Sequence, residues 1–166
     1  MKTIWFYGKN KEDEEILTSL AEIIGEALIN RNKSVEIIVQ SEIQEILGRG
    51  LKDTDEDRST FADRLGFLGN LLHRNNIFAL IISCNAPVND RKLVKENHGN
   101  YLQVSLDSGD SLTDILLDKK NDLTVSAKEI LEYLINKGLV PEQSQTIYSE
   151  DEEEEIRKRL EDLGYV

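Results

Sequence analysis

Cysteine and histidine, two residue types often used in catalysis, are scarce in this chain of 166 residues, which has one cysteine and two histidines. Cys84 ends an apolar run, where α/β proteins often place a site, but no histidine lies near it in sequence. We therefore expect a buried, unreactive thiol. His73 and His98 lack a metal-ligand spacing, and we expect both to face solvent. A single cysteine also excludes an internal disulfide and multi-cysteine zinc sites, and it favours a reducing compartment such as the cytoplasm.

A group of acidic residues close behind Gly8 is a second candidate for chemistry. Asn10 is placed to cap a helix whose first turn holds Glu12, Asp13 and Glu14. Unpaired N–H groups at a helix N-terminus favour negative charge, so we expect these acids to close the helix end themselves. A site for Mg²⁺ or Ca²⁺, which prefer carboxylate oxygens, is the alternative. We adopt the first interpretation, with no metal.

Net charge limits the possible partners. The chain holds 20 Lys and Arg against 32 Asp and Glu, a formal net charge of −12. Such a charge repels polyanions, so we expect no nucleic acid and no anionic membrane as a partner. The longest apolar run, residues 77–82, is too short to span a membrane, and the first residues resemble a strand rather than a signal peptide. A cytoplasmic protein is expected.

Hydrophobic periodicity predicts strands that alternate with helices over one domain, residues 1–140. This alternation favours an α/β fold with a three-layer, doubly wound, mostly parallel sheet. Between residues 107 and 126 there is room for one short helix around 112–117 and a brief strand near Leu123. The other expected strands are 3–8, 35–39, 77–84 and 101–107, and the other expected helices lie around 16–28, 56–75 and 130–135.

Residues 141–166 differ in character from the rest of the chain. A linker opens the segment, and Ser149 with Glu152 forms a capping box that predicts an acidic amphipathic C-terminal helix. Three Glu-to-Lys or Glu-to-Arg pairs at i,i+4 support it. The helix either docks on its own domain or frays in solvent, or it binds a partner.

Four stretches in this order resemble the adenylylsulfate kinases. They are Ile4-Trp-Phe-Tyr-Gly8, Asp57-Arg58 with Arg64 six residues later, Ala86-Pro87, and Ser126 to Leu134. The resemblance implies a P-loop NTPase fold and the transfer of phosphate from ATP to the 3′-hydroxyl of adenylyl sulfate. It also implies substrate-facing positions at Arg58, Arg64 and Arg91.

The phosphate-binding loop of that family is altered in this chain. Its pattern, G-x-x-x-x-G-K-[ST], starts at Gly8 and places Asp13, Glu14 and Glu15 at the three diagnostic positions. In the pattern, backbone N–H groups and the Lys hold the phosphates, and the hydroxyl binds Mg²⁺. Two unit charges about 4 Å apart interact by about 4 kcal/mol at an effective dielectric of ~20. Replacing one attraction with several repulsions predicts the loss of tight ATP binding.

Other parts of the family's site are also changed. Residues 39–44 lack the two acids and the arginine of the corresponding segment, Phe61 replaces an asparagine, and the lid has no counterpart between residues 107 and 126. Arg58, Arg64 and Arg91 remain as candidates for residual binding of an anion or substrate. Their alternative role is ordinary ion pairing on the surface of an acidic protein.

These observations predict a non-catalytic pseudo-kinase that acts as a binding or regulatory module linked to sulfate activation. No cofactor is expected in that case. The alternative is an active phosphotransferase of the family that uses ATP and Mg²⁺, with Lys9 and Lys11 holding the phosphates. A third possibility is an assembly role, as a homo-oligomer or paired with another sulfate-pathway enzyme.

Overall fold

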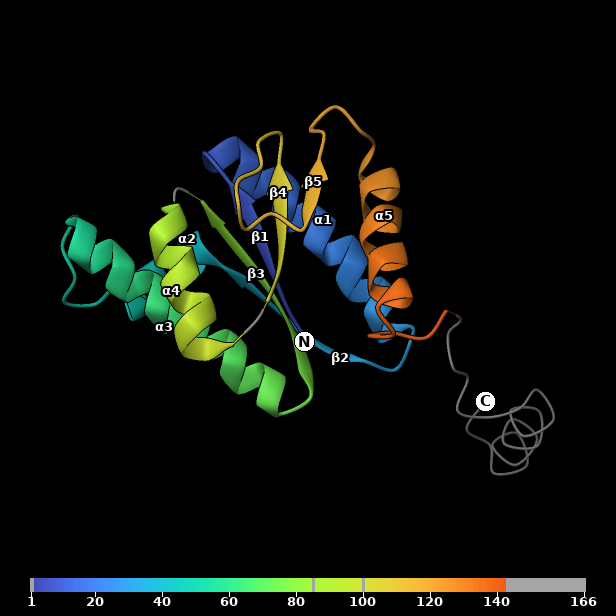
Figure 1. The fold of residues 1–166 in the computed structure, drawn as a ribbon, viewed down its shortest axis with the longest axis horizontal. Coiled ribbons are helices and arrows are strands. Elements are labelled where there is room, and N and C mark those ends of the chain that lie inside the picture. Colours follow the sequence, from blue (N-terminus) through green and yellow to red (C-terminus); the bar gives the residue numbers. More distant parts are fainter. Residues whose placement is uncertain (1, 85, 100, 143–166) are drawn as a thin grey trace, which may run out of the picture.

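A five-stranded parallel sheet organises the chain (Figure 1). The computed structural model describes residues 2–84, 86–99 and 101–142. The strands lie in the order β2-β3-β1-β4-β5, so β1 is central and pairs with β3 and β4. The predicted α/β fold with a parallel sheet is confirmed. The strands are β1 (Thr3–Gly8), β2 (Ser34–Val39), β3 (Ile77–Cys84), β4 (Leu102–Leu106) and β5 (Ile115–Leu117).

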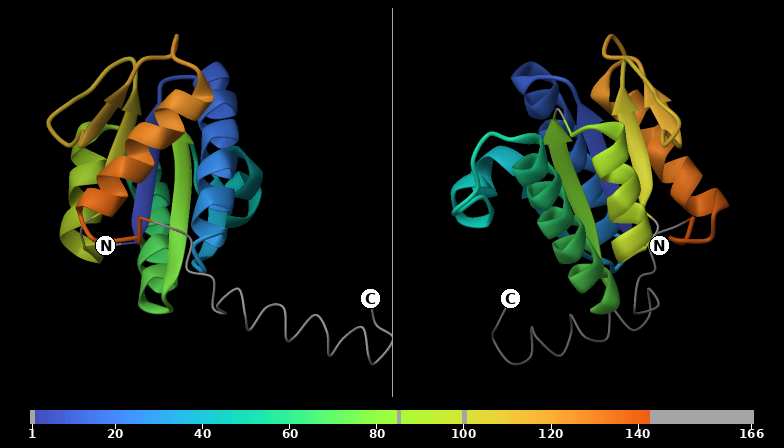
Figure 2. Two further views of the ribbon diagram at one scale, coloured as in Figure 1. Left: turned by 90° about the vertical axis from the view of Figure 1, so that its right-hand side faces the viewer. Right: turned by 60° about the vertical axis from the view of Figure 1, so that its left-hand side comes forward.

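Helices cover both faces of the sheet and complete three layers (Figure 2). The helices are α1 (Lys11–Ile29), α2 (Gln40–Leu47), α3 (Asp55–Arg74), α4 (Val88–His98) and α5 (Leu123–Asn136). α1 and α5 pack together on one face, and α3 and α4 pack together on the other. Because all strands are parallel, their carboxyl ends meet at one edge of the sheet, where α/β proteins place ligands.

The two hydrophobic cores follow from alternation along the central strands. In β3, Phe78, Leu80 and Ile82 join the core beneath α1 and α5, whereas Ala79 and Ile81 join the core beneath α3 and α4. Strands that are buried on both faces have apolar residues at successive positions, as this strand does. The apolar run at 77–82 therefore indicated an interior strand, predicted over 77–84, correctly.

The expected order of elements after β4 is wrong. Residues 115–117 form a strand rather than part of a helix, and Leu123 begins α5 rather than lying in a strand. Ile115 and Leu117 are buried and Leu116 is exposed, which is the period-two pattern of a strand with one face on the core. The side chain of Asp122 accepts a hydrogen bond from the Thr124 N–H and caps α5.

Helices α2 and α4 were not predicted, because α2 is only eight residues long, with Ile43 and Leu47 partly buried against the core, and α4 carries no broad apolar stripe. No residue of α2 is buried, and the buried residues of α4 are Val94 and the charged Arg91. The predicted C-terminal helix, with Ser149 and Glu152, lies outside the described residues, so the division of the chain at residue 140 stays a prediction. Among the residues described, no helix is long and apolar enough to cross a membrane.

Two glycines inside helices give a matched test of the packing. A Cβ on Gly66 of α3 would overlap Val94 Cγ1 and lie 2.9 Å from His98 Cδ2, whereas a Cβ on Gly25 of α1 would meet Ile37 Cδ1 at an ordinary 3.5 Å. We expect Gly66→Ala to lower the free energy of unfolding by about 1–3 kcal/mol, because the branched Val94 cannot turn away. Gly25→Ala is expected to raise it by about 0.5–1 kcal/mol through helix propensity.

Urea unfolding of the two variants measures the difference. Equal effects from Gly66→Ala and Gly25→Ala would contradict the close approach of α3 and α4.

Candidate functional site

The loop from β1 to α1, residues 8–10, lies at the carboxyl edge of the central strand. Asn10 caps α1 as predicted, since its side-chain oxygen accepts a hydrogen bond of 3.0 Å from the Asp13 N–H. Gly8 is buried, and a Cβ there would lie 2.6 Å from Asp13 Cβ. The loop and the first turn of the helix therefore fold tightly against each other, with Asp13 packed against the Gly8 backbone.

The Asp13 carboxylate binds the groups that would otherwise face a ligand. One oxygen accepts a 2.8 Å hydrogen bond from the Lys9 backbone N–H, and the other accepts a 2.8 Å hydrogen bond from Lys119 Nζ. Only 6% of Asp13 is exposed. Burial raises the pKa of this carboxyl, but the hydrogen bonds from Lys119 and Lys9 outweigh burial, and the pKa lies below its ordinary value. Asp13 is therefore a buried, ionised partner of its own loop.

The neighbouring acids behave differently from Asp13. Glu12 lies 3.2 Å from Lys119 Nζ and shares this ammonium group. Glu15 is exposed and Glu14 is half-buried. The sequence predicted three carboxylates inside the former phosphate position, whereas only Asp13 hydrogen-bonds to the loop backbone. The physical reason is helical geometry, because successive residues point about 100° apart around the axis.

Lys119 was missed by the sequence reasoning. It lies 106 residues from Asp13, in the segment between β5 and α5 whose structure was predicted incorrectly. The Asp107 side chain fixes its backbone by accepting a 2.7 Å hydrogen bond from the Lys119 N–H. No local motif marks such a residue, because only the parallel sheet brings it to the β1–α1 loop.

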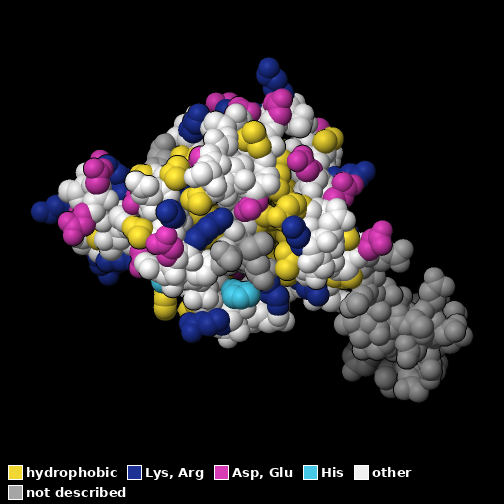
Figure 3. All heavy atoms as spheres, in the orientation of Figure 1, with side chains coloured by type: hydrophobic (Ala, Val, Ile, Leu, Met, Phe, Trp, Pro, Cys, Tyr) yellow, Lys and Arg dark blue, Asp and Glu magenta, His cyan; other side chains and the backbone are white. Residues whose placement is uncertain are grey.

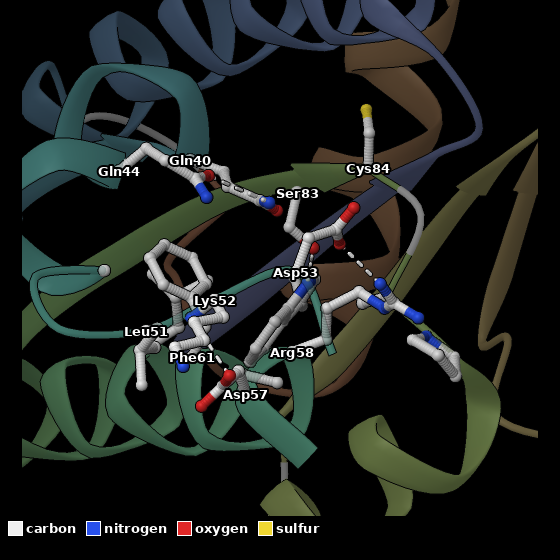
Figure 4. A pocket seen from close by; sticks show the side chains of 16 residues that line it. Gln40, Gln44, Leu51, Lys52, Asp53, Asp57, Arg58, Phe61, Ser83 and Cys84 are labelled. Carbon is white, nitrogen blue, oxygen red and sulfur yellow. Dashed lines mark hydrogen bonds and ion pairs between the residues drawn. The ribbon is translucent and has the colours of Figure 1, made fainter. Parts of the chain in front are cut away.

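A pocket of about 720 Å³ opens beside the loop, between α2, α3 and the end of β3 (Figure 4). Its apolar wall combines aromatic and aliphatic side chains, and its rim carries amides and charges of both signs. The apolar lining includes Trp5, Leu51, Phe61, Ala62, Leu65 and Pro87; the polar lining includes Gln40, Gln44, Lys52, Asp53, Asp57, Arg58, Ser83 and Cys84.

Of the three predicted arginines, Arg58 lines this pocket. Its guanidinium lies 2.5 Å from an Asp53 oxygen and also pairs with Asp55, and both acids are almost fully exposed. Figure 4 shows Arg58 directed toward Asp53. The expected surface ion pairing is thus present, and exposed pairs of this kind are weak enough for an anionic ligand to compete.

Arg64 does not line the pocket; it donates a hydrogen bond to the Leu47 carbonyl and so ties α3 to the end of α2. Arg91 is 1% exposed, and the expectation of surface ion pairing is wrong for it. Its guanidinium bonds to the Ala86 carbonyl at 2.9 Å, to Gln103 at 2.7 Å and to Asp110 at 2.6 Å.

The guanidinium of Arg91 also lies over the Tyr7 ring, 3.9 Å from its centre. Because every nitrogen of the guanidinium has an internal acceptor, Arg91 holds α4 and the loop after β4 on the sheet rather than facing a ligand. An arginine in a buried position carries no hydrophobic signal, which is why sequence analysis placed it on the surface.

Cys84 is partly exposed at the pocket, not buried as expected, and its Sγ donates to the Asn10 carbonyl at 3.2 Å. Partial burial, together with the nearby charges of Glu14 and Asp13, raises the pKa of the thiol to about 11. The thiol is therefore protonated at neutral pH and a poor nucleophile, as the sequence predicted.

Both histidines are half-buried rather than solvent-facing, because α3 and α4 pack over them. His98 Nε2 lies 2.8 Å from an Asp63 oxygen, and burial lowers the pKa of His73. Within the described ranges, no group of three His, Cys, Asp or Glu residues is arranged to hold a metal ion.

The chain matches the family model for adenylylsulphate kinase over residues 1–114. It belongs to the adenylylsulfate kinase family. It is 28% identical over 107 residues to the adenylyl-sulfate kinase of Deinococcus deserti, and the aligned region covers 64% of this chain and 58% of the relative. It is 31% identical over 103 residues to the adenylyl-sulfate kinase of Rippkaea orientalis, and this aligned region covers 61% of this chain and 55% of the relative. The chain thus spans little more than half the length of these relatives.

Solved structures of the family share the fold. Two structures of the Mycobacterium tuberculosis adenylylsulfate (APS) kinase, one of them in complex with AMPPNP and APS, superpose with TM-scores of 0.69 and 0.68. They are 20% and 15% identical, and each comparison covers 80% of this chain and 96% of the other. A hexameric APS kinase from Thiobacillus denitrificans has a TM-score of 0.68 at 18% identity, covering 82% of this chain and 29% of that one.

Arg91 and Arg58 form a matched pair for mutation. We expect Arg91→Met to lower the free energy of unfolding by about 3–5 kcal/mol, because Asp110 and Gln103 would lose a buried partner. Arg58→Met should leave the unfolding midpoint nearly unchanged, because its two acids are exposed. Chemical denaturation of both variants measures this. A mild effect at Arg91 would contradict the buried network.

The lowered pKa of Asp13 also has a consequence for acid stability. Since its pKa in the folded chain is below the ordinary 3.8, its ionisation stabilises the fold above that pH, and this contribution is lost as the pH falls through the folded value. We expect the stability of wild type to fall more steeply than that of Asp13→Asn as the pH drops from about 5 to about 2.

Urea unfolding across that range checks the pH dependence, with Glu15→Gln as an exposed control on the same helix. Parallel curves for wild type and Asp13→Asn would contradict the ionised Asp13.

Proposed function

We propose that this chain is a non-catalytic member of the adenylylsulfate kinase family that acts as a binding or regulatory module. One observation carries the proposal: the Asp13 carboxylate accepts the hydrogen bonds of the Lys9 N–H and of Lys119, at the loop where the family pattern holds phosphate. A triphosphate would have to displace a buried, ionised carboxylate and then lie beside Glu12 and Glu14.

The chemistry of phosphoryl transfer explains why this loss is decisive. Catalysis of that reaction depends on positioning the phosphates and on stabilising their charge, and little covalent chemistry is left to the protein. Here Glu14 stands at the Lys position and Glu15 at the hydroxyl position of the pattern. A Lys-to-Glu change replaces an attraction with a repulsion of about 4 kcal/mol at ~4 Å. Glu14 at the Lys position and Glu15 at the hydroxyl position would each raise the barrier to phosphoryl transfer.

The pocket beside the loop supports a retained binding role. Trp5, Phe61 and Leu65 give it an apolar wall that suits a flat ring, and Gln40 and Gln44 offer amide groups at its rim. The related enzyme of M. tuberculosis was solved with APS, a sulfated nucleotide. We propose that the pocket binds adenylyl sulfate or a close analogue without phosphorylating it, with Arg58 meeting the anionic part.

A role beside other proteins fits the same proposal. One relative, from T. denitrificans, is a hexamer. We propose that this chain forms a homo-oligomer or pairs with a sulfate-pathway enzyme in the cytoplasm. On the face shown in Figure 3, acidic and basic side chains lie interspersed.

A kinase assay and a binding assay together test the proposal. We expect no ADP above the blank when the chain is mixed with ATP, Mg²⁺ and adenylyl sulfate. Calorimetry should nevertheless detect adenylyl sulfate, and Arg58→Met should weaken that binding about tenfold, since hydrogen bonds to charged groups contribute about that much. The control is Arg49→Met, an exposed arginine that does not line the pocket.

Turnover that depends on the chain would refute the loss of catalysis and favour the alternative, an active kinase that uses Lys9 and Lys11. Absence of adenylyl sulfate binding, with no turnover, would leave the loss of catalysis intact and refute the binding role.

A further inference from the structure

Asp13 and Lys119 form an ion pair that is not part of the N-terminal cap of α1. The capping contact of α1 is made by Asn10, which accepts the Asp13 N–H. Asp13 instead points back, and its carboxylate lies between the Lys9 N–H on one side and the Lys119 ammonium on the other, at 2.8 Å from each nitrogen. A backbone N–H and a lysine are also the two kinds of donor that bind the oxygens of phosphate.

The packing around Asp13 holds the start of its side chain directly against the Gly8 backbone. A Cβ on Gly8 would lie 2.6 Å from Asp13 Cβ and 3.2 Å from Cys84 Sγ. No room is left between the loop backbone and the acid for an added methyl group. The Lys9 N–H already donates to the Asp13 carboxylate, so an external oxyanion that bonded to this N–H would have to replace that carboxylate.

The lysine comes from a distant part of the chain and is held in place there. Its backbone N–H donates to Asp107, and its ammonium group is shared between Asp13 and Glu12. These contacts raise the pKa of Lys119, so it stays charged at neutral pH. The phosphate-loop pattern has a lysine where this chain has Glu14. Lys119, from the segment between β5 and α5, supplies a positive charge beside the loop instead.

We propose that Asp13 is a built-in, autoinhibitory occupant of the β1–α1 loop, and that Lys119 holds it there. The carboxylate mimics one edge of a phosphate group and keeps external oxyanions out. This inference goes further than the proposed loss of phosphoryl transfer, because it assigns the exclusion to one removable side chain. It is independent of whether the neighbouring pocket binds adenylyl sulfate.

The test uses inorganic pyrophosphate as the probe and isothermal calorimetry as the measurement. We expect Asp13→Gly to bind pyrophosphate about tenfold more tightly than wild type, or better, because the Lys9 N–H and Lys119 are then free to meet it. The double variant Asp13→Gly/Lys119→Met should lose this gain. The control Glu12→Gln removes a contact of Lys119 without opening the loop and should leave pyrophosphate affinity close to that of wild type.

A second readout reports on the Lys9 amide itself. In ¹H–¹⁵N spectra, pyrophosphate should shift the Lys9 amide resonance of Asp13→Gly and leave that of wild type unchanged. Asp13→Asn, which keeps the side-chain shape, serves if Asp13→Gly does not fold, and it should show a smaller gain of the same sign. Equal pyrophosphate binding by wild type and both Asp13 variants would overturn the proposal, as would a gain that persists without Lys119.

Discussion

The short contact between the Asp13 carboxylate, the Lys9 N–H and the Lys119 ammonium organises the carboxyl edge of this sheet. A helix that starts directly after a central strand leaves unpaired N–H groups and partial positive charge at that point. A chain that binds phosphate there satisfies these groups with a ligand. In this chain the Asp13 carboxylate occupies the Lys9 N–H of the loop instead.

Two arginines, like Lys119, are paired with carboxylates of this chain. Arg58 pairs with Asp53 and Asp55 at the rim of the pocket, and the buried Arg91 of α4 pairs with Asp110 of the loop after β4. The two pairs differ in strength because they differ in burial. Arg91 is removed from water and depends on its acceptors, whereas Arg58 remains accessible to competing anions.

The sequence predicted those parts of the fold that depend on local hydrophobic pattern. The strand at 77–84 was predicted to the residue because its positions 78–82 alternate between the two cores. Helix α3 was predicted within one residue at each end, from an apolar stripe that faces the sheet. Asn10 was identified as a cap because capping involves residues only three positions apart.

Features that depend on tertiary contacts were not accessible in the same way. The burial of Arg91 depends on Gln103 and Asp110, which the sheet brings to it from β4 and the following loop. Lys119 reaches Asp13 across 106 residues of sequence. Residues 115–117 are too few for a period-two pattern to outweigh the neighbouring leucines. The family resemblance located the loop and its altered positions, whereas the partner of Asp13 required the structure.

The position of Trp5 gives the domain an optical reporter of its own. It is the only tryptophan in the chain, and its indole N–H donates a 2.7 Å hydrogen bond to the Ser83 hydroxyl at the pocket wall. An indole whose polar end is bonded inside a protein emits according to the groups around it. A molecule that entered the pocket and engaged Ser83 would alter that surrounding. The intrinsic fluorescence of the unlabelled chain therefore records occupancy of this cavity without any added dye.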